Sequence, residues 1–152
     1  MKRSATAPTV APVLVLAVGN PSRGDDALGP ELAARLEAAA LPGVEVIVEF
    51  QLQVENALDL VGRERVIFVD AGNGTPAPFE LRCVEPAAEF LHTSHALSPE
   101  AVLATYERVT GEPPPESWVL CVRGEAFELG EGLSEAASRH LAAAWQQLRQ
   151  LV

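Results

Sequence analysis

Short apolar runs that alternate with helix-like segments most constrain what this chain can fold into. Residues 13–18, 44–50 and 66–69 are apolar nearly throughout, as in strands that are buried on both faces. Between them, leucines spaced four apart predict a helix over residues 28–40, which Pro42 and Gly43 end, and residues 54–62 predict a shorter helix. Strands that alternate with helices favour a mostly parallel sheet covered by helices on both faces.

The second half of the chain continues this pattern. Residues 79–84 and 118–122 predict two more strands. Ser98 is followed by proline and an acidic residue, which predicts a capped helix through about residue 109, and Ser134 caps a last helix. We therefore expect an α/β fold, a three-layer α/β/α sandwich around a mostly parallel, twisted sheet of about five strands. Residues 1–11 are interpreted as a disordered tail and residues 12–152 as a single domain.

Composition excludes several classes of partner. The 152 residues include 11 Lys and Arg against 21 Asp and Glu, a formal charge of −10, which disfavours nucleic acid and anionic membranes. No run of 18 apolar residues predicts a membrane span, and the N-terminus lacks a signal-peptide cleavage site, so we expect a cytoplasmic protein. Cys83 and Cys121 lie in apolar runs and are expected to be reduced and buried. The only lysine is Lys2.

The loop after the first predicted strand does not fit nucleotide binding. Gly19 and Gly24 have the spacing of a phosphate-binding loop, but Asp25 and Asp26 stand where lysine and serine or threonine are needed. Their carboxylates would repel a phosphate. The dinucleotide fingerprint also fails, because proline follows Gly19 and Asn20.

Carboxylates and an imidazole lie in three loops that should meet at the carboxyl ends of the strands. Asp26 follows the first strand, Asp70 ends the third, and His95 precedes a helix. Two oxygen ligands and one nitrogen ligand suit a divalent cation such as nickel or zinc. The sequence therefore predicts a metal-binding site with open positions.

Each of these residues also has a structural interpretation. Asp25 or Asp26 could cap the following helix, and Asp70 could be a turn residue in a glycine-rich loop. His95 could be an ordinary packed or exposed histidine, and His92 is a second candidate ligand. His140 is interpreted as a surface residue.

Other chemistries are disfavoured by missing residues. A receiver-type phosphoacceptor needs a lysine near its last strand, and this chain has none there. A serine hydrolase of the α/β type needs a Gly-x-Ser-x-Gly elbow, which the sequence lacks.

The motifs resemble those of the maturation endopeptidases of nickel–iron hydrogenases over nearly the whole chain. They are the segment 13–30 around Gly-Asn-Pro-Ser-Arg-Gly-Asp-Asp, the strand and aspartate at 66–71, Thr-Ser-His at 93–95 and Gly-Leu-Ser at 132–134. The resemblance implies a compact three-layer sandwich. It also implies an endopeptidase that removes the C-terminal extension of the hydrogenase large-subunit precursor after nickel insertion, cutting after a basic residue.

The resemblance assigns the metal-recognising positions to Asp26, Asp70 and His95, with Asp26 or Asp70 as the base of an aspartyl-type peptidase. We expect Gly19, Asn20 and Asp25 to contact the substrate. Nickel would belong to the precursor, so no resident metal is required, and the protein is expected to be a monomer.

Residues 51–55, Gln-Leu-Gln-Val-Glu, depart from the glycine-rich turn of many members and resemble the branch serving soluble NAD-reducing hydrogenases. The alternative function is a non-catalytic nickel-binding chaperone or sensor that uses the same residues.

Overall fold

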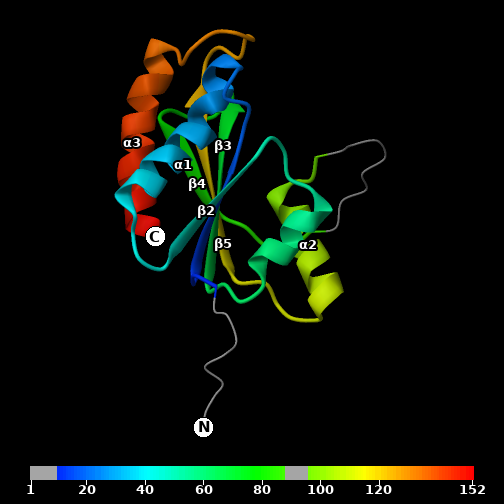
Figure 1. Cartoon of the computed structure of the whole chain (residues 1–152). Helices are drawn as coiled ribbons and strands as arrows, with labels where there is room; N and C mark the ends of the chain where they lie inside the picture. The colour runs from blue at the N-terminus through cyan, green and yellow to red at the C-terminus, as the bar shows by residue number, and fades with distance from the viewer. Residues whose placement is uncertain (1–9, 88–95) are drawn as a thin grey trace.

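Five strands form one sheet in the computed structural model, which describes residues 10–87 and 96–152 (Figure 1). The strand order is β2-β1-β3-β5-β4, with parallel pairing except between β4 and β5. The strands are β1 (Val13–Val18), β2 (Val44–Glu49), β3 (Arg65–Asn73), β4 (Phe79–Cys83) and β5 (Glu116–Gly124). The predicted α/β fold with a mostly parallel sheet is confirmed.

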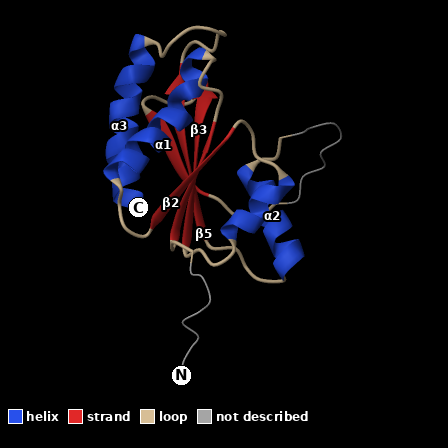
Figure 2. Ribbon diagram, viewed as in Figure 1, coloured by secondary structure: helices blue, strands red, loops and turns tan. Residues whose placement is uncertain are grey.

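Helices cover both faces of this sheet (Figure 2). They are α1 (Leu28–Ala39), α2 (Pro99–Thr110) and α3 (Glu135–Leu151), with 3-10 helices η1 (Gly24–Ala27) and η2 (Val54–Leu60). Helices α1 and α3 lie on one face, and α2 with η2 lies on the other. The predicted caps are confirmed, since the hydroxyls of Ser98 and Ser134 accept from the amides of Ala101 and Ala137.

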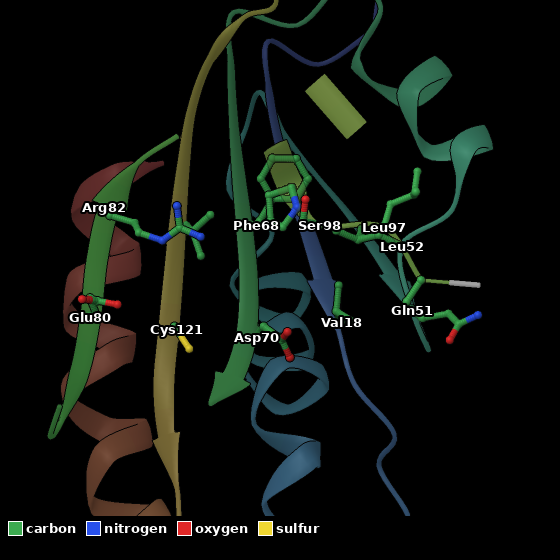
Figure 3. A pocket seen from close by; sticks show the side chains of 13 residues that line it. Val18, Gln51, Leu52, Phe68, Asp70, Glu80, Arg82, Leu97, Ser98 and Cys121 are labelled. Carbon is green, nitrogen blue, oxygen red and sulfur yellow. The ribbon is translucent and has the colours of Figure 1, made fainter. Parts of the chain in front are cut away.

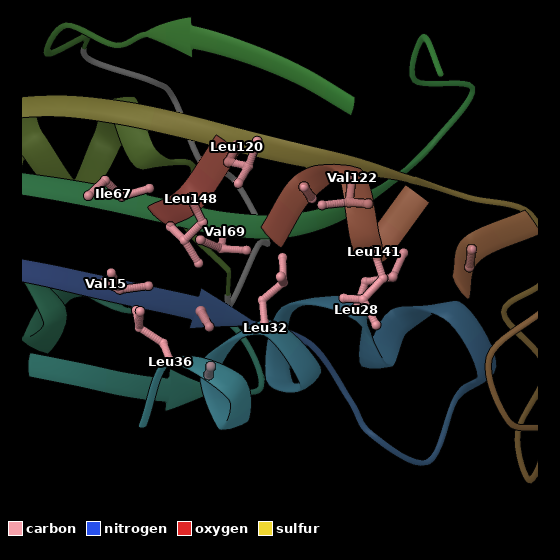
Figure 4. Close-up of a cluster of buried hydrophobic side chains, with 14 residues drawn as sticks. Val15, Leu28, Leu32, Leu36, Ile67, Val69, Leu120, Val122, Leu141 and Leu148 are labelled. Atoms are coloured by element: carbon pink, nitrogen blue, oxygen red, sulfur yellow. The ribbon is translucent and has the colours of Figure 1, made fainter. Parts of the chain in front are cut away.

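Successive residues of each central strand serve opposite cores. In β1, Val15 faces α1 and α3, whereas Leu14 and Leu16 face α2 and η2. All three are fully buried, which is why the strand is apolar throughout. Figure 4 shows the core on the α1 and α3 side, where strand residues pack with Leu32 and Leu148.

The predicted end of the third strand is wrong. Asp70 was expected at the end of this strand, beside a glycine-rich loop. Instead β3 continues to Asn73, because each residue from Asp70 to Asn73 pairs with β5, which itself continues to Gly124. Gly72 permits this pairing, since a Cβ there would lie 2.5 Å from Sγ of Cys121. Asp70 therefore lies within the strand ladder, where its backbone is fixed by a neighbouring strand.

Three further sequence expectations have definite outcomes. The cysteines form no disulfide, but Cys83 is exposed and Cys121 is partly buried, so their predicted burial is wrong. Residues 54–60 form a 3-10 helix where a short helix was expected. No helix among residues 10–87 and 96–152 is long and apolar enough to cross a membrane.

Candidate functional site

The loop from β1 to α1 folds back on itself and places Asp26 over the end of β1. The amide of Asn20 donates to Oδ2 of Asp26 over 2.8 Å, and the amide of Asp26 donates to the carbonyl of Arg23. Gly19 has φ of 154°, and a Cβ there would collide with the carbonyl oxygen of Asp26. Gly19 and Asn20 thus shape the loop that holds Asp26, and their expected contact with substrate stays a prediction.

Asp70 presents its carboxylate from the adjacent strand β3. Its Oδ1 accepts from the amide of Ala71 over 2.7 Å, and Oδ2 has no hydrogen-bond partner among the described residues. The pKa of Asp70 is raised from 3.8 to about 6, chiefly by burial and also by the negative charge of Asp26, whereas the hydrogen bond from the Ala71 amide lowers it. Two carboxylates that influence each other in a half-buried position are typical of acid–base and cation-binding sites.

Asp25 lies beside Asp26 in the sequence but has a different role. Its carboxylate has no exposed surface and accepts four hydrogen bonds, from the amides of Glu125, Ala126 and Ser134 and from the Ser134 hydroxyl. Burial alone would raise the pKa of Asp25, but these hydrogen bonds outweigh it and lower the pKa below 3.8. The geometry supports neither the expected substrate contact nor a cap on α1. Instead Asp25 ties η1 to the loop before α3.

Two histidines were predicted as candidate metal ligands. His92 and His95 lie outside the described residues. Within the described ranges, no three histidine, cysteine, aspartate or glutamate side chains are grouped to hold a metal ion. The set of Asp26, Asp70 and His95 therefore stays a prediction. His140, expected at the surface, is partly buried, and its Nδ1 lies 2.9 Å from the carbonyl oxygen of Arg123.

A cavity of about 330 Å³ adjoins Asp70 on the α2 side of the sheet (Figure 3). Residues of four strands form its floor, and the β2–η2 loop and the beginning of α2 form its walls. Its lining is Val18, Gln51, Leu52, Phe68, Asp70, Glu80, Arg82, Ala96, Leu97, Ser98, Pro99, Val119 and Cys121.

Sequence reasoning missed Glu80, Arg82 and Cys121 as cavity residues. The alternation in β4 could have found them, because Phe79 and Leu81 face the core under α3 and leave Glu80 and Arg82 on the side of Asp70. What the sequence did not reveal is that β4 pairs with β5. Burial raises the pKa of the Cys121 thiol, as do the charges of Asp70 and Glu80, against a contact from Thr75 that lowers it. Cys121 is therefore a neutral thiol near neutral pH.

The fold is similar to solved structures of hydrogenase maturation proteases. The hydrogenase maturating endopeptidase HybD from E. coli is 25% identical, with a TM-score of 0.70 over 90% of this chain and 88% of that one. HycI, a [NiFe] hydrogenase maturation protease from Thermococcus kodakarensis KOD1, is 22% identical, with a TM-score of 0.66 over 92% and 91%.

The hydrogenase 2 maturation peptidase from the Thaumarchaeota archaeon SCGC_AB-539-E09 is 23% identical, with a TM-score of 0.65 over 91% of this chain and 96% of that one. No protein family model matches the chain, and no curated protein does. The resemblance drawn from the motifs is confirmed by these structures. The likeness to HybD supports a protease, and the other two structures show the same fold. The similarity to the branch that serves soluble NAD-reducing hydrogenases stays a prediction, because these structures do not test it.

Proposed function

We propose that this protein is an endopeptidase that removes the C-terminal extension of a nickel–iron hydrogenase large-subunit precursor once nickel has been inserted. The observation that carries the proposal is the fold shared with the hydrogenase maturating endopeptidase HybD, combined with two interacting carboxylates, one in the loop after β1 and one on β3. The likeness to HybD supports the reaction class, and the carboxylates supply groups that can perform it.

Asp70 is the better candidate for the base that activates water. A carboxylate with a pKa of about 6 is mostly ionised at neutral pH, yet it accepts a proton more readily than an ordinary aspartate. It would take a proton from water as the oxygen attacks the scissile carbonyl carbon. That proton would then pass to the leaving amine nitrogen as the peptide bond breaks.

Asp26 would serve chiefly in recognising the nickel that the precursor carries, together with His95. The backbone amide of Asn20 holds one of its oxygens and orients the carboxylate. Completing the coordination of a metal already seated in the substrate would place the scissile bond beside Asp70, so that cleavage waits for nickel insertion. In this scheme nickel is part of the substrate. The cytoplasmic location and the monomeric state belong to the same proposal.

The deciding experiment incubates the protein with a nickel-loaded and a nickel-free large-subunit precursor and measures the mass of the products. We expect the loaded precursor alone to lose its C-terminal extension. Asp70→Asn should slow this cleavage by about 10²- to 10⁴-fold, the usual contribution of a general base.

The controls separate the alternatives. If nickel-loaded precursor is bound but never shortened, the chaperone or sensor function replaces the proposal. If nickel-free precursor is cleaved equally well, nickel recognition is wrong although the protease is right. If His95→Ala processes the loaded precursor at the normal rate, His95 is not part of the recognition set.

A further inference from the structure

The flank of the molecule formed by β2 and η2 carries a cluster of exposed apolar side chains. Among the described residues, eight large apolar side chains are exposed, and half of them lie on or beside η2. These four, with exposed fractions from 49% to 72%, are named the η2 face: Phe50, Val54, Leu58 and Val61. Proteins that act alone seldom gather exposed apolar side chains in one place, and such clusters mark surfaces that bind other molecules.

Polar contacts hold η2 alongside the edge strand β2, so these side chains belong to one surface. Within η2, Nδ2 of Asn56 donates to Oε2 of Glu49 at the end of β2 over 3.0 Å. Just after η2, the guanidinium of Arg63 lies 2.7 Å from Oε1 of Glu45, near the beginning of β2. η2 therefore runs back along β2, and its outer side extends the flank of the sheet.

Only one side of η2 packs on the sheet. Ala57 and Leu60 are buried in the core on the α2 side. Leu58 and Val61 each follow one of these residues and are themselves three residues apart, which is one turn of a 3-10 helix. They therefore lie together on the outer side, where the described part of the chain leaves them exposed.

The η2 face is continuous with the cavity beside Asp70. Phe50 directly precedes Gln51 and Leu52, which line this cavity (Figure 3). Glu49, which Phe50 follows, lies two strand spacings, about 10 Å, across the sheet from Asp70. A folded protein that presents a peptide bond to Asp70 must therefore come close to the η2 face.

The charge around the η2 face disfavours a second copy of this chain as its occupant. Glu55 and Glu64 are exposed beside it, and Asp59 is partly exposed. The chain as a whole has a formal charge of −10. Two copies placed face to face would bring these carboxylates together, at a cost in electrostatic repulsion.

We propose that the η2 face binds an apolar patch on the folded body of the hydrogenase large-subunit precursor, while the C-terminal extension of that protein reaches Asp70. The inference rests on the proposed function, because it states where the same substrate is held. A specific contact between two proteins buries roughly 800 Å² on each partner, more than a cavity that receives a chain terminus supplies. The η2 face adds to this contact and takes no part in the chemical step.

Cleavage kinetics of the nickel-loaded precursor test this docking surface. Phe50→Ser and Leu58→Ser should each raise KM about tenfold and leave kcat within about twofold, because each removes an apolar contact that the ground state and the transition state share. Val109→Ser is the matched control. Val109 is 61% exposed, as is Leu58, but it lies in the last turn of α2, whereas the cavity is lined by Pro99 at the beginning of that helix. Its KM should equal that of the wild type.

A second measurement requires no cleavage. The inactive Asp70→Asn protein is prepared with the photoreactive residue p-benzoylphenylalanine in place of Leu58 or of Val109, and it is irradiated with nickel-loaded precursor. We expect position 58 to cross-link to an apolar segment of the precursor upstream of the cleaved bond, and position 109 to give no cross-link. In the same Asp70→Asn background, Leu58→Ser should raise the Kd for the precursor about tenfold.

The outcomes distinguish this inference from the proposed function. If the wild type cleaves the precursor and both serine variants keep its KM, the docking surface is overturned and the protease stands. A wild-type dimer that Leu58→Ser converts into a monomer in sedimentation also overturns it, because the η2 face would then pair two copies. If the precursor is bound but never cleaved, and Leu58→Ser weakens that binding, the docking surface survives the loss of the protease.

Discussion

Asp25 and Asp26 are neighbours in the chain, yet their carboxylates lie in different surroundings. Asp25 is fully buried and accepts four hydrogen bonds, three of them from backbone amides that would otherwise be unpaired. Asp26 is partly exposed, and its carboxylate accepts one amide hydrogen bond, from Asn20. The first residue stabilises the loops around the site, and the second is free to meet a substrate.

Replacing Asp25 and Asp26 one at a time by asparagine should distinguish an effect on stability from an effect on activity. Asp25→Asn should lower the free energy of unfolding by about 2 to 4 kcal/mol, since hydrogen bonds to a buried carboxylate are lost and amides are left unsatisfied. Asp26→Asn should cost less than about 1 kcal/mol, and it should slow cleavage at least a hundredfold. Urea unfolding and precursor cleavage per folded molecule measure the two effects. Equal destabilisation by both variants would contradict this division of roles.

The ionised form of Asp70 should lower the free energy of unfolding of this protein. Its pKa is about 6 in the folded chain against 3.8 for an ordinary aspartate, so the unfolded state loses this proton more easily. Stability is therefore lost as pH rises from about 4 to above 6. Asp70→Asn removes the charge, and its stabilising effect should be small at pH 4 and reach about 1 to 3 kcal/mol at pH 7.5.

Urea unfolding at both pH values, with a chelator present, measures this effect. Asp70→Asn should be the more stable protein and the less active one, as expected when a charged group is kept half-buried for function. A stabilisation that is the same at pH 4 and pH 7.5 would show that ionisation of Asp70 is not its cause.

At the scale of elements, α1 approaches the sheet unusually closely where the site is formed. Gly29 lies in the first turn of α1, and a Cβ there would lie 2.5 Å from the carbonyl oxygen of Val18 and 3.2 Å from that of Val69. The glycine lets the helix begin directly over the end of β1 and over Val69 of β3. Because Asp26 lies two residues before this helix, the close packing also restricts its position.

Gly29→Ala should move the first turn of α1 away from β1 and β3, because the added methyl group would collide with the carbonyl oxygen of Val18. We expect a loss of about 1 to 3 kcal/mol in the free energy of unfolding, the usual cost of overpacking, together with weaker processing of the precursor. Gly132→Ala is the control, because no atom lies within 4 Å of a Cβ there, and it should leave stability nearly unchanged. The prediction fails if urea unfolding finds the two variants equally stable.

Over the whole molecule, the cavity lies on the α2 side of the sheet, between the strands, the β2–η2 loop and the beginning of α2. On the α2 side, Leu103 and Tyr106 pack over the part of the sheet that contains Leu14 and Leu16. The floor of the cavity begins at Phe68, which pairs with Leu16, and extends along β3 to Asp70 and across to the edge strand β4. The site thus combines the loop after β1 with a patch of the sheet beside the beginning of α2.

Sequence alone determined the layers, because burial on both faces requires apolar residues throughout a strand and a helix requires leucines at its own period. It also singled out Asp26 and Asp70 as candidate site residues, because both carboxylates follow buried apolar runs, and their chemistry belongs to the proposed function. Only the tertiary structure separated Asp25 from Asp26, because burial depends on the loop before α3, more than 100 residues away in the chain. The cavity, too, was found only in the tertiary structure. Glu80 lies near Asp70 because β4 pairs with β5, and strand pairing depends on contacts between distant segments that a local pattern does not encode.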